Sequence, residues 1–509
     1  MCTKPDGDPL ASTDVVVIGA GIAGLTAAAL LSRKGCNVVL LEAHHQSGGC
    51  AGTFRRGRYT FDAGATQVAG FEPGGSHQRL FAELGVPLPQ ATPLDPGCVV
   101  DLGDGQPAVQ IWRDPQRWRQ ERQRQFPGSE RFWQLCERLH QSNWAFAAGQ
   151  PVLPPRNLWD LQQLVGALKP ATLASGIFGL ASVADLLRLS GCSGPQHQRL
   201  RRFLDLQLKL YSQEPAERTA ALYGVTVLSM VQEPLGLWHL HGSMQALSRS
   251  LETALEQSGG DLRLRHRVEQ LSASPDGWLV QGTAPQGQPF QLEAREVVCT
   301  VPPQALPKLL GPQMPRGLQQ RLQHLGDPSG ALVLYGAVPR ERLPDACPSH
   351  LQLQWAAPGP LFVSVSQEGD GRAPAGEATV IASVFTPARP WFGLGKEAYQ
   401  RAKQQAQQGI EAGLQQLLGL QPEHWLQREL ATPRGFARWT GRPFGFVGGI
   451  GQAPDRFGPF GLASRTPLPG LWLCGDAIYP GEGTAGVSLS AEMAVRQLLQ
   501  AQRKPGLAA

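Results

Sequence analysis

Apolar runs near both ends of the chain predict short buried strands that lead into helices. Val15–Ile18 is a β-branched run typical of a parallel strand buried on both faces, and the alanine-rich residues 27–31 favour a helix. A second apolar run, Val38–Leu41, predicts another strand. Near the C-terminus, Leu471–Leu473 predicts a strand, and a helix is expected from about Val487. The two ends of the chain are therefore expected to share one sheet.

The middle of the chain predicts elements of two kinds. The alternating runs Ala331–Tyr335 and Leu361–Val365 indicate a separate β-sheet. A helix over 243–257 and strands over 262–271, 278–280 and 296–301 are expected to belong with the first sheet.

Glycines fill the turn between the first strand and the first helix. Gly19, Gly21 and Gly24 form the pattern G-x-G-x-x-G, and Glu42 ends the second strand. The first glycine allows a tight turn, the second lets backbone N–H groups reach a pyrophosphate, and the third lets helix and strand pack closely. The helix start adds partial positive charge, and Glu42 is placed to accept hydrogen bonds from a ribose diol. The motif predicts a dinucleotide site without choosing between NAD and FAD.

Further loops of small residues accompany this motif. A glycine pair stands at 48–49, and the stretch at 61–65 reads FDAGA. Far along the chain, Gly-Asp at 475–476 closes a strand, and 480–486 is a loop without bulky side chains. Additional backbone approaches suit a cofactor longer than a single nucleotide, which favours FAD.

Together these motifs resemble the amine oxidase and phytoene desaturase superfamily, and within it the carotenoid desaturases and carotene isomerases. Residues 61–77 and 480–491 resemble the carotenoid 3',4'-desaturases most closely. The chain departs from the family at Cys50, where many members carry arginine, and at His241, where the family has glycine. The resemblance implies FAD, held by Gly19, Gly21, Ala23, Gly24, Glu42, Ala43, Gly48, Gly49, Gly64, Ala65, Val268, Gly475, Asp476, Gly486 and Val487.

The resemblance also implies roles for parts of this set. Asp476 is expected to hold a ribityl hydroxyl, and the start of the last helix is expected to face the N1–C2=O edge of the flavin. The backbone near Val268 is expected to face the adenine, although its side chain also suits a plain position in a sheet.

The implied fold class is α/β. It combines a Rossmann-like FAD-binding domain of the two-dinucleotide-binding-domain type with an α+β substrate domain that carries a mixed sheet and helices. The FAD-binding domain is expected to be discontinuous, with pieces at 12–90, 236–308 and 462–502, and the substrate domain takes 91–235 and 309–461. A chain of 509 residues suits such a division, since single cores stop growing at roughly 250–300 residues.

The composition of the chain limits the classes of binding partner that are expected. The net charge of +5 argues weakly for contact with anionic surfaces and not for nucleic acid. The arginine- and tryptophan-rich run at 111–133 is therefore interpreted as a surface helix. Nine cysteines without C-x-x-C spacing indicate a reducing compartment, and the histidines lack ligand spacing, so no metal is expected.

Membrane contact is expected on one face only. The first 14 residues have no apolar core, and no run approaches the ~20 apolar residues that a spanning helix needs, so neither a signal peptide nor a transmembrane helix is expected. The run at 170–184 contains no charged residue. It predicts either a segment that dips into one leaflet or a buried helix of the substrate domain. We expect a peripheral membrane protein on the cytoplasmic side.

The chemistry is expected to depend on the flavin. No nucleophile, triad or metal cluster is evident, and removing hydrogen from a polyene requires a hydride acceptor such as flavin N5. Glu482 is the one acid in the loop expected to face the flavin, with either proton transfer or loop solvation as its role. Residues 440–446 are expected to help line a substrate tunnel. Since only one dinucleotide fingerprint is present, electrons are expected to leave to a quinone or oxygen.

These observations predict an FAD-dependent carotenoid desaturase, an enzyme of carotenoid biosynthesis that dehydrogenates an acyclic carotenoid end by 3',4'-desaturation. A carotene cis–trans isomerase of the same family is the main alternative, because both use one scaffold. An amine oxidase and a non-enzymatic prenyl-lipid carrier are weaker alternatives.

Overall fold

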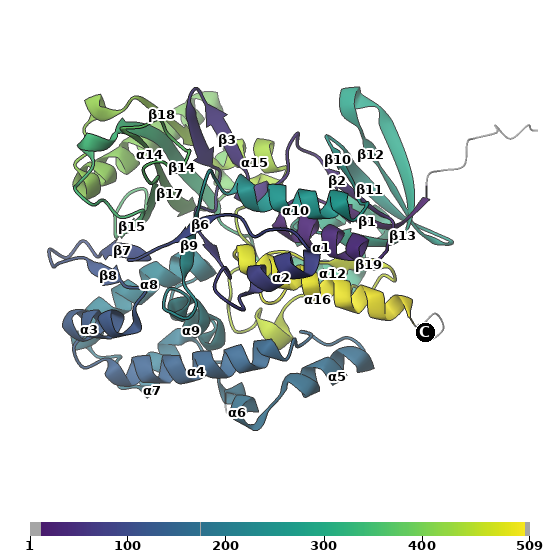
Figure 1. Ribbon diagram of the computed structural model, residues 1–509, viewed down its shortest axis with the longest axis horizontal. Coiled ribbons are helices and arrows are strands. Elements are labelled where there is room, and N and C mark those ends of the chain that lie inside the picture. The colour runs from purple at the N-terminus through teal and green to yellow at the C-terminus, as the bar shows by residue number, and fades with distance from the viewer. Residues whose placement is uncertain (1–11, 174, 504–509) are drawn as a thin grey trace, which may run out of the picture.

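The computed structural model describes residues 12–173 and 175–503 (Figure 1). A first sheet with its helices lies on the right of Figure 1, a second sheet lies at the upper left, and a group of helices lies along the bottom. Residues 1–11 lie outside the described residues, so the expectation that no signal peptide stands there remains a prediction.

The first sheet draws its strands from three separate stretches of the chain. The strand order is β10 (Asp261–Leu264), β2 (Val38–Glu42), β1 (Ser12–Ile18), β13 (Pro289–Cys299), β12 (Gly277–Thr283) and β11 (Arg267–Ser274), and β19 (Leu471–Leu473) also pairs with β13. The pairs from β10 to β13 and the pair with β19 are parallel, whereas β12 and β11 are antiparallel. The two ends of the chain do share this sheet.

Both faces of the parallel strands are buried, as the β-branched run predicts. Val15 and Val17 point into a core formed with helices α1 (Ile22–Arg33), α2 (Ser76–Leu84), α10 (Gln245–Gln257) and α16 (Thr484–Gln502). Val16 and Ile18 point into the opposite core, which includes α11 (Leu306–Leu310) and α12 (Arg316–His324). Helices therefore cover both faces of the parallel strands.

The second sheet is mixed and has one face in contact with a helix. The order is β18 (Gln427–Ala431), β14 (Gly330–Pro339), β17 (Glu377–Thr386), β16 (Leu361–Val365), β15 (His350–Leu353), β7 (Cys98–Asp101) and β8 (Val109–Ile111). Only β15 and β7 pair in parallel among these strands. Leu332 and Leu334 pack with α14 (Lys396–Leu418), while Ala331 and Val333 face a cavity.

The helices along the bottom of Figure 1 are α3 (Pro115–Gln125), α4 (Glu130–Ala148), α5 (Leu158–Ala167), α6 (Pro170–Leu173), α7 (Val183–Leu189), α8 (Gln198–Ser212) and α9 (Ala221–Ser229). Of these, α4, α5, α6, α8 and α9 contribute residues to the wall of that cavity. The remaining elements are the hairpin β3 (Thr53–Arg56) and β4 (Tyr59–Asp62), the small sheet of β5 (Val68–Ala69), β9 (Leu237–Leu240) and β6 (Ala91–Pro93), and the helices α13 (Pro390–Gly393) and α15 (Pro433–Thr440).

Three expected elements are wrong in detail. The strand expected over 262–271 is two strands, because Arg265 adopts a φ of 59° and the chain turns between β10 and β11. The last helix begins at Thr484, earlier than expected. The run at 170–184 is not one helix: α6 ends at Leu173, a 3₁₀ turn covers Gly176–Phe178, and α7 begins at Val183. Glycine, a weak helix former, explains the break in that run.

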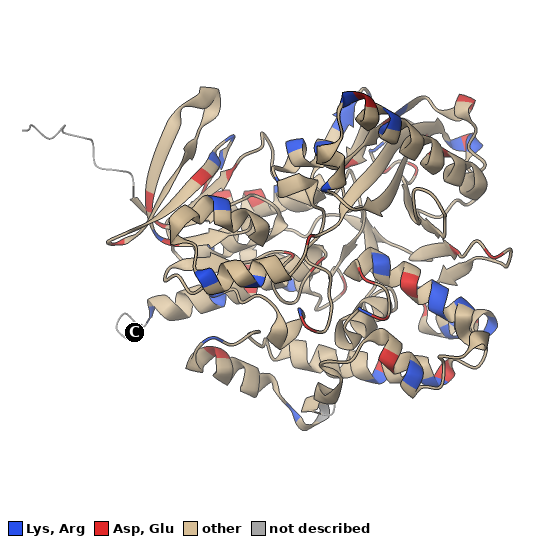
Figure 2. Cartoon of the chain, turned by 180° about the vertical axis from the view of Figure 1, so that it is seen from behind, with Lys and Arg blue, Asp and Glu red and all other residues tan. Residues whose placement is uncertain are grey.

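The arginine- and tryptophan-rich run forms α3 and the start of α4. Trp118 and Trp133 are buried and pack edge to face with ring centroids 5.7 Å apart. Arg122 pairs with Glu137 at 2.9 Å, and basic and acidic residues alternate over this part of the surface in Figure 2. The tryptophans therefore belong to the core and do not form an exposed stacking surface, so the interpretation as a fully solvated helix face is corrected for these two rings.

A buried ion network joins the hairpin β3–β4 to the second sheet. Arg372 lies before β17 and contacts Asp62 at 2.8 Å and Asp370 at 3.1 Å, and His239 of β9 contacts Asp370 at 2.7 Å. The other oxygen of Asp62 accepts a hydrogen bond from the backbone N–H of Met244 at 2.8 Å. Since Met244 is the N-cap of α10, this hydrogen bond connects the start of that helix to the ion network. The charged groups of the network are all buried.

Candidate active site

One cavity of about 1620 Å³ lies where the parallel strands of the first sheet end. Ile18 at the end of β1 and Leu41 at the end of β2 both line it. The cavity continues between the second sheet and helices α4, α8 and α9. It is larger than the ~300–1,000 Å³ of an ordinary small-ligand pocket, so it has room for a dinucleotide and a second long ligand.

The glycine loop and the start of α1 form one wall. Gly21 is the N-cap of α1, with φ −69° and ψ 177°, and no side chain caps the helix. A Cβ at Gly21 would meet no atom within 4 Å, because that position opens into the cavity. Gly24 differs: its Cβ would lie 1.8 Å from the carbonyl oxygen of Gly19. Gly21 therefore leaves room for a ligand, and Gly24 allows helix α1 to pack against the loop.

Glu42 ties the glycine loop to the end of β2. Its two carboxylate oxygens accept hydrogen bonds from the backbone N–H groups of Ala20 and His44, each at 2.7 Å. Burial raises the pKa of Glu42, while these backbone hydrogen bonds oppose that rise. The carboxylate thus orders the loop as well as lining the cavity.

The second glycine pair packs directly on the first loop. The N–H of Gly48 donates to the carbonyl of Ala20 at 2.8 Å, and a Cβ at Gly49 would lie 3.3 Å from Cα of Gly21. Gly48 also has a φ of 107°, which side chains disfavour. The pair is therefore needed for two stretches of backbone to meet beside the cavity.

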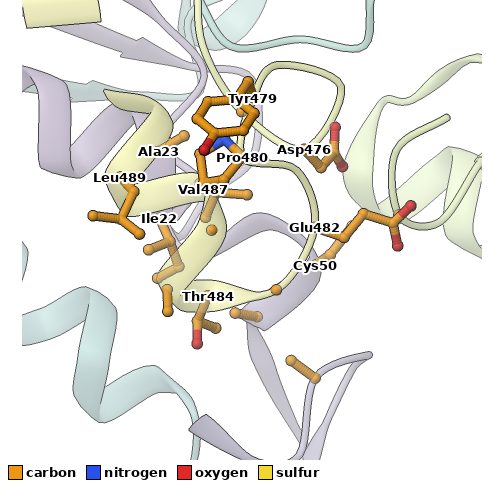
Figure 3. Close-up of a pocket in the computed structure, with 18 of the residues that line it drawn as sticks. Ile22, Ala23, Cys50, Asp476, Tyr479, Pro480, Glu482, Thr484, Val487 and Leu489 are labelled. Atoms are coloured by element: carbon orange, nitrogen blue, oxygen red, sulfur yellow. The ribbon is translucent and has the colours of Figure 1, made fainter. Parts of the chain in front are cut away.

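The start of α16 also lines the cavity, beside the start of α1 (Figure 3). The N-cap of α16 is Gly483, again without a side-chain cap, and a Cβ at Gly486 would lie 2.6 Å from the carbonyl oxygen of Gly481. Two helices thus direct uncapped N-termini, with their partial positive charge, toward one cavity.

Arg442 also lines the cavity. Its guanidinium donates to Asp476 at 2.6 Å and contacts Sγ of Cys50 at 3.2 Å. Cys50 is the position at which the resemblance expects arginine. The guanidinium of Arg442, from a distant loop, lies next to Cys50. Sequence reasoning missed this contact because 392 residues separate Arg442 from Cys50.

Every residue expected to hold the cofactor except Gly24 lines this cavity, and so does Glu482. Residues 440–443 of the segment expected to line a tunnel also reach it. Sequence reasoning missed three residues that line the cavity: Tyr211 of α8, Gln213 at the C-cap of α8, and Tyr223 of α9. Their spacing carries no motif that could have identified them. Among the described residues, no cluster of His, Cys, Asp or Glu is arranged to hold a metal ion.

The residues present fit an FAD. The open position at Gly21 lets a pyrophosphate approach the backbone, Glu42 lies at the end of β2 where a ribose would bind, and the N-terminus of α16 also faces the cavity. A free helix N-terminus, open backbone and an acidic residue are the groups that suit a dinucleotide.

A comparison with models of protein families shows to which family the chain belongs. The model for flavin-containing amine oxidoreductases matches residues 22–499. The chain belongs to this family. The chain is 26% identical over 509 residues to prolycopene isomerase 2 of an Oncidium hybrid cultivar, covering 95% of this chain and 83% of that protein. It is 24% identical over 515 residues to 4,4'-diapolycopene oxygenase of Methylomonas sp, covering 94% and 96%.

Two further likenesses agree with this assignment. The chain is 25% identical over 271 residues to phytoene desaturase of Cercospora nicotianae, covering 52% of this chain and 42% of that protein. The solved structure of putrescine oxidase bound to putrescine has a TM-score of 0.65 and 19% identity, covering 97% of this chain and 100% of that one.

The predicted family and fold class are thereby confirmed. The protein is an FAD-dependent oxidoreductase with an α/β fold, and it is related to the carotenoid desaturases and isomerases.

Proposed function

We propose that this flavoenzyme dehydrogenates an acyclic carotenoid end, at the 3',4' position. The observation that carries the proposal is the continuity of one cavity. The cavity that borders the glycine loop of α1 also extends over the second sheet, where Ala331, Val333 and Ile381 face it. A long ligand lying on that sheet would reach the cofactor at one end.

The far part of the cavity suits a hydrocarbon. Its wall includes Leu222, Val227, Met230, Phe362 and Phe385, all apolar. Burying apolar surface contributes roughly 25 cal/mol per Å², so a polyene would bind there through its length alone. The three relatives are named a prolycopene isomerase, a diapolycopene oxygenase and a phytoene desaturase. All three names refer to such polyenes. An amine oxidase is less favoured, because none of these three names refers to an amine.

Bound FAD supplies the hydride acceptor. The protein's own part is to hold the polyene with the carbon to be oxidised at the flavin end of the cavity and to exclude water. A carbocation left by hydride loss is delocalised along the conjugated chain, so the wall needs no strong countercharge. We propose a quinone or oxygen as the final electron acceptor.

A carotene isomerase is the second candidate. The match to prolycopene isomerases over 95% of this chain favours it. An isomerase would use the same cavity and cofactor but would return every hydrogen to the pigment. The two candidates therefore differ in the mass of the product.

Anaerobic incubation of the enzyme with an acyclic carotene tests this difference. The desaturase proposal expects a red-shifted pigment lighter by two hydrogen atoms, with added quinone needed for repeated turnovers. A product of unchanged mass and altered retention would contradict the desaturase and support the isomerase.

We further propose that the cavity opens to one leaflet of a membrane on the cytoplasmic side. Around α5 and α6, at the lower edge of Figure 1, exposed apolar side chains gather: Leu158, Leu161, Val165, Leu168, Leu173, Ile177 and Leu180. Leu168, Gly176 and Gly179 also line the cavity, so this apolar face meets its opening. Exposed Arg156 and Lys169 would suit anionic headgroups. None of the helices in the described ranges is long and apolar enough to cross a bilayer.

The division into five alternating segments is part of this proposal. The first sheet takes strands from 12–90, 236–308 and 462–502, and the second sheet takes strands from 91–235 and 309–461. The active cavity would then lie between the FAD-binding domain and the substrate domain.

A further inference from the structure

The carboxyl of Glu482 reaches the cavity from the loop that precedes α16. Figure 3 shows its side chain extending away from Ile22 and Val487, on the side where Asp476 lies. Glu482 is partly accessible, and it lines the cavity. The carboxyl is thus withdrawn from the protein surface but open to a ligand.

Gln213 fixes the orientation of this carboxyl. Nε2 of Gln213 donates to Oε1 of Glu482 at 2.7 Å and to the carbonyl of Gly449 at 3.2 Å. The other end of the amide, Oε1, accepts from the backbone N–H of Ser329 at 3.0 Å. Because Ser329 must face the amide oxygen, the NH₂ group must face Glu482. The carboxylate therefore has a dedicated donor on one oxygen.

Two glycines allow the neighbouring loop to close on this carboxyl. A Cβ at Gly448 would lie 2.8 Å from Oε2 of Glu482, and a Cβ at Gly449 would lie 2.2 Å from the carbonyl oxygen of Asp476. Side chains at either position would displace the carboxyl or its loop. The close fit indicates a built site and not a residue that only solvates a loop.

Resting on the proposed function, we infer that Glu482 is the base that accepts the proton in the dehydrogenation. Bound FAD would supply the two-electron acceptor that takes one hydrogen of the substrate as hydride. The neighbouring C–H bond breaks, its proton passes to the Glu482 carboxylate, and its electron pair forms the new double bond. The two hydrogens that the substrate loses are thus accounted for, one as hydride and the other as the proton on Glu482.

The charges around Glu482 suit this role. Burial raises the pKa of Glu482 from 4.5 to about 8, assisted by Asp476 and opposed by Gln213 and Arg442. Tyr223 of α9 is the other titratable group that faces it. A base whose pKa lies near the working pH combines a useful ionised fraction with strong proton affinity. Only the ionised form accepts the proton, so the rate should fall as the pH falls below about 8.

The test compares Glu482→Gln with Glu296→Gln. Glu296 is a half-buried glutamate whose pKa burial also raises, but it lies outside the cavity, where it accepts a hydrogen bond from the Trp472 indole at 2.7 Å that glutamine preserves. The holoenzymes are mixed anaerobically with the carotene, and bleaching of the flavin is followed. FAD and carotene affinities are measured separately by fluorescence quenching.

We expect Glu482→Gln to bleach the flavin at least ~100-fold more slowly with both affinities retained, the size usual for loss of a general base, and Glu296→Gln to match the wild type. Bleaching by Glu482→Gln within about threefold of the wild type would overturn the inference alone. Wild-type enzyme that isomerises the pigment without bleaching would overturn the proposed function and the inference together.

The wild type provides an independent check if Glu482→Gln fails to fold. Its bleaching rate should rise with pH through a pKa near 8, whereas a flat profile from about pH 6 to about pH 10 would overturn the inference. Gln213→Met, which removes a hydrogen bond that lowers this pKa, should shift the profile to higher pH.

Discussion

Two neighbouring glycines of the first loop should respond oppositely to substitution. Gly21 has an extended backbone that any residue adopts, and a Cβ there meets no atom within 4 Å. Gly21→Val should therefore leave the stability of the apoprotein nearly unchanged. At Gly24, a Cβ would lie 1.8 Å from the carbonyl oxygen of Gly19 and 3.0 Å from its carbon. Because both atoms are backbone, α1 would have to move away from β1.

The expected magnitudes follow from these distances. Overpacking costs ~1–3 kcal/mol and more where backbone must shift, so Gly24→Ala should lower the free energy of unfolding by ~3 kcal/mol or more. Gly21→Val would block the approach of the pyrophosphate and remove about two hydrogen bonds to charged oxygens, each worth ~1.5–3 kcal/mol. That loss corresponds to FAD affinity weaker by a factor on the order of 10²–10⁴.

The assay pairs urea unfolding of the apoproteins with FAD titration by fluorescence. The reasoning expects Gly21→Val to keep the wild-type unfolding midpoint and lose FAD, and Gly24→Ala to unfold at lower urea. Wild-type FAD affinity in Gly21→Val would refute the placement of the pyrophosphate. Wild-type stability in Gly24→Ala would refute the packing role of that glycine.

Three other changes have defined outcomes. Asp62→Ala removes one of the two buried carboxylates that pair with Arg372 and should cost ~3–5 kcal/mol in urea unfolding; a loss under ~1 kcal/mol would contradict a stabilising role for this buried ion network. Ile177→Asp combined with Leu180→Asp should abolish sedimentation with anionic liposomes and keep FAD, whereas Leu426→Asp, at an exposed leucine beside β18, should not. Arg442→Met removes a positive charge that lowers the pKa of Glu482, so the pH profile of flavin bleaching should shift to higher pH. An unchanged profile would contradict this interaction between Arg442 and Glu482.

Local patterns predicted the tight turns of the glycine loops, because each turn depends on residues close in sequence. The turn between β1 and α1 needs Gly19, which has a φ of 96°, and the second loop needs Gly48 for the same reason. The apolar runs likewise predicted β14 and β16, and both strands are buried over most of their length. The break at Arg265 was missed, because an arginine at positive φ has no compositional signal.

Contacts between distant segments could not be predicted. Arg442 meets Cys50, and Gln213 orients Glu482 through Ser329, only after the loops of the two sheets have come together. Glu482 could be named from its place in the loop, but its hydrogen-bond donor could not. The apolar run at 170–184 was recognised by composition, but a single helix was one of its expected forms, and the structure divides it into α6, a 3₁₀ turn and the start of α7.

An anaerobic titration of the oxidised holoenzyme with an acyclic carotene tests the central claim most directly. Flavin absorbance and pigment mass are recorded on the same samples. The desaturase account predicts one flavin bleached for each pigment molecule that loses two hydrogen atoms. Conversion of the pigment at constant mass while the flavin remains oxidised would contradict it.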